Sequence, residues 1–197
     1  MKQEKKILER ESRKQNRFTA KRLAMMALFV ALSYAVSFLE TPPIAGFLKL
    51  DFGNVFILLS SLLFGPIEGV IVCLLKEGLR CLTSSTLCIG ELANFVITSA
   101  FILLPSVLYR YKKGIKVVIL SLVGGCIIGA GVALVMNRFV LLPWFYELGF
   151  IPVSGAEMFA QVWWILLLFN LAKCILISVI VFLLYKRLSN FLKRWEQ

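Results

Sequence analysis

The chain has 197 residues, 59% of them hydrophobic and only 17% charged, and its formal net charge is +11. A soluble domain of this length is less apolar and more evenly charged, so the composition predicts a membrane protein built as one domain. The basic residues flank apolar runs in clusters, as cytoplasmic segments beside transmembrane helices do, and this arrangement argues against nucleic-acid binding.

The apolar stretches predict six transmembrane helices, because each is bounded by Pro, Gly or charged residues that end helices. In chain order they cover residues 23–39, 52–64, 66–82, 88–109, 117–138 and 159–185. The predicted fold class is all-α, a polytopic membrane domain over residues 23–188 between basic tails at 1–22 and 189–197. We expect the N-terminal tail to lie near anionic headgroups of the lipid bilayer.

Lys and Arg are distributed unevenly between the two ends of these helices. The N-terminal tail, the turn between the fourth and fifth helices and the C-terminal segment from Lys186 onward hold 17 of the 22 basic residues. By the positive-inside rule these segments are cytoplasmic. Both termini are then in the cytosol, and the loops at 40–51, 82–88 and 139–158 face outside.

Residue types that many enzymes require are missing. The chain contains no His, which excludes a His-based metal site or general base. It also lacks the GxxxxGK[ST] phosphate loop, the GxSxG nucleophile elbow and the HExxH zinc motif. We therefore expect no catalytic residues, no metal and no cofactor. Of the five cysteines, Cys81 and Cys88 flank one loop, and the sequence leaves their pairing open.

Ionisable and amide side chains inside apolar stretches are costly in a bilayer, so they usually face a cavity or a partner. Asn170 and Lys173 are three residues apart and share one face of the last helix. They can form a donor site for the polar edge of a ligand, or they can bridge helices, for example by pairing Lys173 with Glu91. Glu91 and Asn94 have the same spacing on the fourth helix. Asn137, near the outer end of the fifth helix, can equally be a structural bridge.

Two features belong to the first three helices. Lys76 and Arg80 share a face of the third helix, and Arg80 can extend its side chain toward the headgroups. Glu68 lies in the turn before this helix, and we expect it to be solvated. Small residues recur every four positions on the first helix, at Ala27, Ala31 and Ala35. They allow close helix approach, either within this chain or to another membrane subunit.

Several short motifs occur together in a specific order. They are GFLKLDF at 46–52, FGPIEGV at 64–70, GELANF at 90–95, Met136-Asn137 ahead of Leu142-Pro143, and NLAK at 170–173. In this order, over about residues 20–190, the chain resembles the riboflavin-binding subunits (S components) of energy-coupling factor (ECF) transporters.

The resemblance implies a six-helix subunit without enzymatic activity that captures riboflavin at the outer face of a prokaryotic plasma membrane. It further implies docking on an ECF transmembrane coupling subunit that carries two ATPase subunits. By resemblance, the flavin contacts are Asn137, Asn170 and Lys173. The loop that closes over the site comprises Phe47, Leu48, Lys49, Leu50 and Asp51. The docking face comprises Ala27, Ala31 and Ala35.

The sequence departs from the family pattern in two places. Gly53-Asn54-Val55-Phe56 stands where the family has Ser-Asp-Ile-Pro, and Glu77-Gly78 stands where it tends to have Asn-Leu. These changes leave open an S component for another small vitamin or a flavin analogue. Two remoter alternatives are a membrane enzyme that uses Glu77 and Glu91 as acid and base, and a structural membrane protein.

Overall fold

A computed structural model describes residues 20–39, 41, 48–84, 86–112 and 114–196, with side chains described up to residue 184. Its helices are α2 (Ala20–Ser37), α3 (Asn54–Phe64), α4 (Pro66–Cys81), α5 (Ile89–Tyr111), α6 (Ile115–Met136), the π-helical turn η2 (Asn137–Leu141), α7 (Leu142–Glu147) and α8 (Gly155–Glu196). The all-α fold class predicted from the sequence is therefore confirmed, with helices at all six predicted positions.

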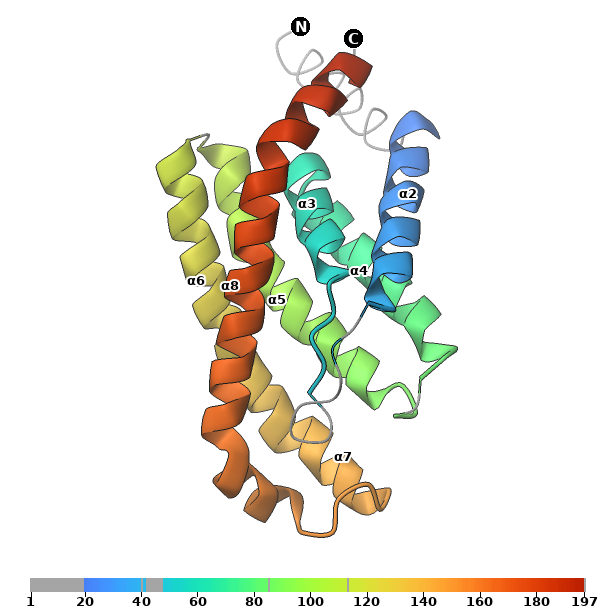
Figure 1. Cartoon of the computed structure of the whole chain (residues 1–197), viewed down its shortest axis with the longest axis vertical. Helices are drawn as coiled ribbons and strands as arrows, with labels where there is room; N and C mark the ends of the chain where they lie inside the picture. The colour runs from blue at the N-terminus through green and yellow to red at the C-terminus, as the bar shows by residue number, and fades with distance from the viewer. Residues whose placement is uncertain (1–19, 40, 42–47, 85, 113, 197) are drawn as a thin grey trace, which may run out of the picture.

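Four of these segments are long and apolar enough to cross a bilayer: α2, α5, the continuous stretch Ile115–Glu147, and Gly155–Leu184 of α8. The apolar helix α3 has only 11 residues and rises about 16 Å, roughly half of a hydrocarbon core. The chain reaches it through a non-helical approach, residues 48–53. Residues 48–53 therefore place non-helical backbone beside the helices of the bundle (Figure 1).

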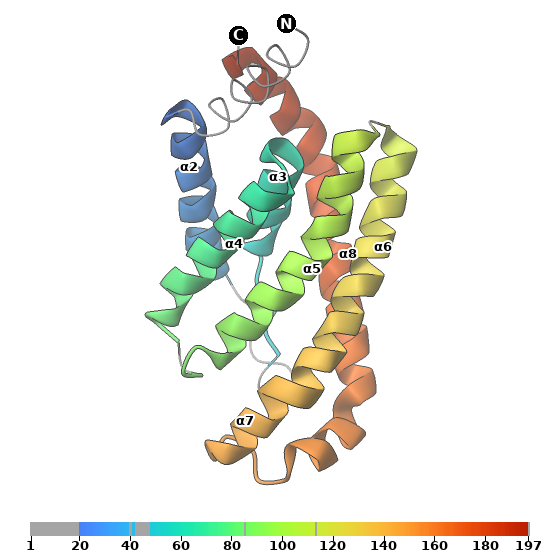
Figure 2. The ribbon, with the colours of Figure 1, turned by 180° about the vertical axis from the view of Figure 1, so that it is seen from behind.

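The helices form one elongated bundle (Figure 1). Helices α5, α6 and α8 lie side by side on one side of it, and α2, α3 and α4 form the other, as the reverse view also shows (Figure 2). The start of α2, the α3–α4 turn and the α5–α6 turn lie at one end, and α7 lies at the opposite end (Figure 1). Short links from α3 to α4, from α4 to α5 and from α5 to α6 join helices that run antiparallel to each other.

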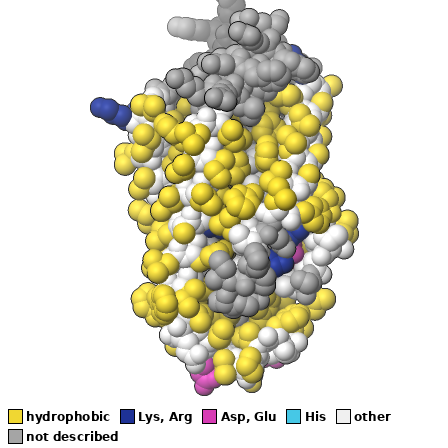
Figure 3. Space-filling view, in the orientation of Figure 1, with side chains coloured by type: hydrophobic (Ala, Val, Ile, Leu, Met, Phe, Trp, Pro, Cys, Tyr) yellow, Lys and Arg dark blue, Asp and Glu magenta, His cyan; other side chains and the backbone are white. Residues whose placement is uncertain are grey.

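Hydrophobic side chains cover most of the visible face (Figure 3). On α6, Leu120 is 73% and Ile127 is 64% exposed, and on α8 Leu183 is 66% exposed. A water-soluble protein rarely exposes so continuous an apolar surface, whereas a lipid-facing surface is expected to be apolar. The surface therefore agrees with the prediction of a membrane protein.

The predicted outer loop at 139–158 was wrong over its first half. The chain stays helical through η2 and α7 to Glu147, so only residues 148–154 separate α7 from α8. The Leu142 N–H donates to the Asn137 carbonyl five residues back, the pattern of a π-helical turn. Pro143 follows this turn and has no N–H to donate. The shifted hydrogen bonds let the helix continue past a residue that normally ends one.

The turn between α3 and α4 is tight and half-buried. Gly65 has φ +126°, a conformation that L side chains rarely adopt, and Pro66 then starts α4. Glu68 is only 4% exposed and pairs with Arg22 of α2, with 3.0 Å between Oε1 and Nη2. The expectation that Glu68 is solvated was wrong, because α2 folds back over the turn and supplies a partner.

Helices α3 and α4 approach closely at Gly69, where an added Cβ would lie 2.3 Å from the Ser61 Cβ. We expect Gly69→Ala to lower the free energy of unfolding by about 1–3 kcal/mol, the usual cost of overpacking. Gly78, on the same helix, has no atom within 4 Å of an added Cβ. Gly78→Ala is therefore the matched control and should raise stability by up to about 1 kcal/mol through helix propensity.

Thermal unfolding of the two purified variants in detergent measures the difference. The melting temperature should fall for Gly69→Ala and rise or stay level for Gly78→Ala, at roughly 2–4 °C per kcal/mol for a chain of this size. Equal shifts in the same direction would show that the close approach of α3 and α4 does not limit stability.

Candidate functional site

A cavity of about 820 Å³ opens among the Leu48–Asp51 segment, α4, α5, α7 and α8. Its apolar lining comprises Phe38, Leu48, Ala93, Ile97, Leu141, Phe145, Phe150, Ile151, Met158 and Phe169. Its polar lining comprises Lys49, Asp51, Glu77, Arg80, Thr83, Ser84, Thr86, Glu91, Asn94, Asn170 and Lys173. A concave, half-apolar site with a few converging polar groups is the usual form of a small-molecule pocket.

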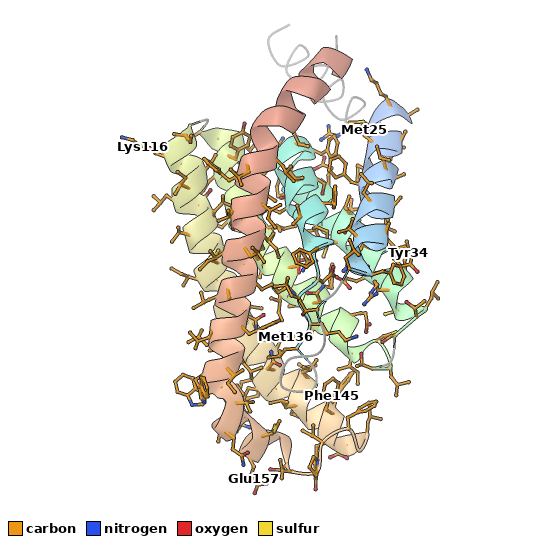
Figure 4. All side chains as sticks on the ribbon, viewed as in Figure 1. Met25, Tyr34, Lys116, Met136, Phe145 and Glu157 are labelled. Atoms are coloured by element: carbon orange, nitrogen blue, oxygen red, sulfur yellow. The ribbon has the colours of Figure 1, made fainter. Side chains whose placement is uncertain are left out.

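The cavity belongs to the half of the bundle away from the basic turn between α5 and α6. Figure 4 places Phe145, which lines the cavity, and Glu157 toward the end opposite Lys116. Phe145 is buried and packs against Phe150 edge to face, with 5.4 Å between ring centroids. The continuation of the fifth helix into α7 thus gives the cavity an aromatic wall where the sequence predicted a loop.

Lys173 lies on α8 with its side chain turned toward α5. Its Nζ donates to the Asn94 Oδ1 at 2.7 Å, and the residue is only 8% exposed. The predicted alternative that Lys173 pairs with Glu91 was wrong. Glu91 instead accepts hydrogen bonds from Ser84 (2.7 Å) and Thr86 (3.2 Å) in the loop between α4 and α5.

Asn170 is brought to the cavity beside Lys173, as their spacing predicted. Its Nδ2 donates to the Leu166 carbonyl of its own helix at 2.8 Å, and the residue is 4% exposed. One amide hydrogen and the amide oxygen therefore point away from that bond and can meet a ligand. Asn170, Lys173 and Asn94 together form a polar corner of the cavity wall.

Asn137 is not among the cavity-lining residues. It is 3% exposed, and its Nδ2 donates to the Ala133 carbonyl at 2.7 Å. Its Oδ1 is buried without a hydrogen-bond partner in the described structure. Asn137 makes no hydrogen bond to Asn170 or Lys173 in the described structure, and its predicted ligand contact stays a prediction. An unsatisfied buried amide oxygen is unusual and marks a group that another donor can satisfy.

The segment before α3 forms one side of the cavity. Leu48 is buried against Leu142 and Leu166, which attaches the segment to α7 and α8. The Leu50 N–H donates to the Thr41 Oγ1 at 3.0 Å. Leu50 is not among the residues that line the cavity. Lys49 and Asp51 do line it. Phe47, predicted for the same loop, lies outside the described residues.

Asp51 and Glu77 are both paired with the ammonium group of Lys76, a residue that was not predicted to belong to the site. Lys76 on α4 is fully buried, and its Nζ pairs with the Asp51 Oδ2 and, at 2.6 Å, with the Glu77 Oε1. Asp51 also accepts from the Gly53 N–H at 2.7 Å. Glu77 also accepts from Asn94. A continuous chain of hydrogen bonds therefore runs from the segment before α3 to Lys173.

Sequence reasoning singled out each of these ionisable residues but not their connection. The available signal was the charge balance of this group: the carboxylates Asp51 and Glu77 and the ammonium groups of Lys76 and Lys173 lie within apolar stretches or next to them. Buried charges need partners, so equal numbers of each sign indicate pairing. Which side chains pair depends on helix packing, which no local spacing encodes.

The remaining predicted features are not among the residues that line the cavity. Ala27, Ala31 and Ala35 are exposed on one face of α2, while its opposite face packs on α3 and α4 through Met26, Phe29, Val30 and Ser33. Cys81 and Cys88 are free thiols, and the Cys88 Sγ lies 3.6 Å from the Cys81 carbonyl oxygen. Within the described ranges, no group of three or more His, Cys, Asp or Glu is arranged to hold a metal ion.

Known proteins are similar to this chain in both sequence and fold. Residues 21–185 match the family described as "ECF transporter, substrate-specific component". The chain is 34% identical over 194 residues to the riboflavin transporter RibU of Staphylococcus aureus (strain TCH60), covering 92% of this chain and 97% of that protein. It is 25% identical over 182 residues to the riboflavin transporter FmnP of Bacillus subtilis (strain 168), covering 88% and 95% of the two proteins.

A solved structure of the S component of a bacterial ECF transporter matches with a TM-score of 0.73 and 34% sequence identity. The match covers 88% of this chain and 98% of that one. Sequence and structure thus agree over nearly the whole length of the protein. The chain belongs to the family of substrate-specific components of ECF transporters.

Proposed function

We propose that this chain is the riboflavin-binding subunit of an ECF-type vitamin importer. The observation that carries the proposal is the polar corner of Asn94, Asn170 and Lys173 in a cavity of about 820 Å³ whose lining is about half apolar. Two relatives that align over most of their length are named riboflavin transporters. Because the family consists of transporter components, the enzyme alternative with Glu77 and Glu91 as acid and base is set aside.

The chemistry of riboflavin suits this cavity. The isoalloxazine ring is a flat apolar tricycle with one polar edge of carbonyls and an N–H group. The apolar walls can bury the ring faces, and Lys173 can donate to a carbonyl of the polar edge. Asn170 can donate to a second carbonyl and accept from the ring N–H. Pairing every polar group of the buried edge is what makes such a site selective.

The ribityl chain of riboflavin carries hydroxyl groups that also need partners. Asp51 and Glu91 are cavity-lining carboxylates, and Ser84 and Thr86 add hydroxyl groups on the same side as Glu91. Carboxylates accept hydrogen bonds from hydroxyls without competing donors. We place the ribityl chain on this side and the ring toward Asn170.

We further propose that the cavity opens outward and that both termini are cytoplasmic in a multi-pass plasma-membrane protein. The basic turn containing Lys116 lies at the end of the bundle away from the cavity (Figure 4). The α5–α6 turn and the last part of α8 lie at that same end (Figure 1). Basic segments stay on the cytoplasmic side, which leaves the cavity facing the outside.

Delivery to the cytosol requires other subunits, because the sequence lacks a phosphate-binding loop. The proposed partners are the ECF transmembrane coupling subunit and its two ATPase subunits. The exposed face of α2 at Ala27, Ala31 and Ala35 is the proposed docking surface. Small side chains in register let a partner helix approach closely.

Uptake of labelled riboflavin tests the whole proposal. Cells without riboflavin uptake of their own receive this chain, alone or together with an ECF coupling subunit and its ATPases. Uptake that requires both the chain and the ATPase module is the expected result. Uptake that stays at the background level with every subunit present in the membrane would contradict it.

One observation favours an alternative within the same class. Glu77 lines the cavity where the family resemblance predicts Asn, so the cavity wall carries an additional carboxylate. An S component with this wall could select a flavin analogue or another small vitamin with an additional donor. Mass spectrometry of the small molecule that copurifies with the protein distinguishes this alternative from riboflavin.

A further inference from the structure

Lys76 is the most deeply buried charged residue described in this protein, with 0% of its surface exposed. It does not line the cavity, whereas both of its carboxylate partners, Asp51 and Glu77, do. The ammonium group therefore lies behind the cavity wall and reaches the ligand space only through other side chains. A buried charge in this place requires an explanation other than ligand contact.

Asp51 and Glu77 each connect Lys76 to a different part of the site. Asp51 belongs to the segment before α3, and its Oδ1 accepts from the Gly53 N–H at 2.7 Å. The Gly53 carbonyl in turn accepts from the Ser33 Oγ of α2 at 2.8 Å. Through Asp51, Lys76 thus fixes a non-helical part of the cavity wall against α2 and α4.

Glu77 carries the second branch. Its Oε1 accepts from the Asn94 amide on α5 as well as from Lys76. The Asn94 Oδ1 then accepts from the Lys173 ammonium on α8 at 2.7 Å. Because Glu77 accepts a hydrogen bond from the Asn94 Nδ2, the Asn94 oxygen is turned toward Lys173. Lys76 is therefore connected to the polar corner through two intervening side chains.

We propose that Lys76 is a positioning residue for ligand capture. It holds the segment ending at Asp51 against the cavity and, through Glu77 and Asn94, sets the direction of the Lys173 ammonium. Without Lys76, two buried carboxylates face each other with no cation between them, and like charges at low dielectric repel strongly. The segment at Asp51 is the part free to move, because it has no helical hydrogen bonds of its own.

Limited trypsin digestion of the detergent-purified chain tests the first branch without any ligand. Lys49 is exposed two residues before Asp51, and Lys112 is exposed at the end of α5, far along the chain from this network. In Lys76→Met, cleavage after Lys49 should be faster by at least about fivefold, because proteolysis follows the population of locally opened chains. Cleavage after Lys112 in the same sample should be unchanged.

This result separates positioning from a merely structural role. Equal acceleration at Lys49 and Lys112 would mean that the substitution destabilises the whole protein and would overturn the proposal. Unchanged cleavage at Lys49 would overturn it as well. If Lys76→Met fails to fold, the same digestion is carried out on Asp51→Asn. This substitution releases the same segment but leaves the Lys76–Glu77 pair, and it should accelerate cleavage at Lys49 alone.

Riboflavin binding tests the second branch, which rests on the proposed function. Lys76→Met should raise the riboflavin Kd roughly 10-fold, within the range of couplings between residues that share one network. In the Asp51→Asn/Glu77→Gln background the same substitution should change Kd less than about twofold, because its targets are already neutral. A 10-fold effect in both backgrounds would show that Lys76 acts by another route. A wild-type protein that ignores riboflavin would reject the proposed function, while the digestion still decides the role of Lys76.

Discussion

Replacing Lys173 by Met should weaken riboflavin binding about 100-fold, which corresponds to about 2.7 kcal/mol. Methionine keeps an unbranched apolar side chain but removes the ammonium that now contacts Asn94 at 2.7 Å. The flavin carbonyl then loses a charged donor, and the buried carboxylates Asp51 and Glu77 lose one of the two cations near them. Quenching of flavin fluorescence on titration measures the Kd directly.

The matched control is Lys116→Met, which removes an exposed ammonium near the start of α6. This control should bind like the wild type, because Lys116 lies at the end of the bundle away from the cavity (Figure 4). Size-exclusion chromatography of both variants confirms that they are folded. A Lys173→Met protein with wild-type affinity would remove Lys173 from the site.

Replacing Ala31 by Phe should abolish ATP-driven uptake while leaving riboflavin binding unchanged. Ala31 is exposed on α2, on the face opposite the core residues Met26, Phe29 and Val30. A phenyl ring there keeps the surface apolar but prevents the close approach that small residues allow. Uptake in cells and binding by the purified subunit are measured on the same variant, so that loss of docking is separated from loss of the site.

Val135→Phe is the control for this substitution. Val135 is a 56% exposed apolar residue on α6, where added bulk should meet only lipid. Uptake near the wild-type rate is expected for it. If Ala31→Phe transports as well as Val135→Phe, then α2 does not dock through its alanine face. If Ala31→Phe loses binding too, the alanine face instead packs within this chain.

The sequence was sufficient to place the helices because their ends carry strong local signals. Gly65-Pro66 separates α3 from α4, and the basic residues around Lys112 separate α5 from α6. It failed at Pro143, since a proline normally ends a helix and only the π-helical hydrogen bond from Leu142 to Asn137 carries this helix onward. No periodicity signals that single shifted bond.

The candidate site was predictable only in part, for a different reason. Asn170 and Lys173 share a helix face, so spacing alone brings them together. The pairing of Lys76 with Asp51 joins residues 25 apart in the chain, and that of Lys173 with Asn94 joins residues 79 apart. Such contacts depend on how the helices pack. Spacing could not decide between Glu91 and Asn94 as the partner of Lys173, because both lie on one face of α5.

Titration of the detergent-purified protein with riboflavin tests the central claim most directly. A bound flavin ring exchanges water for the aromatic and apolar walls of the cavity, so its fluorescence should be quenched. We predict saturable quenching at one riboflavin per chain and weaker binding for Lys173→Met but not for Lys116→Met. A folded, monodisperse protein that leaves riboflavin fluorescence unchanged at every concentration would contradict the account.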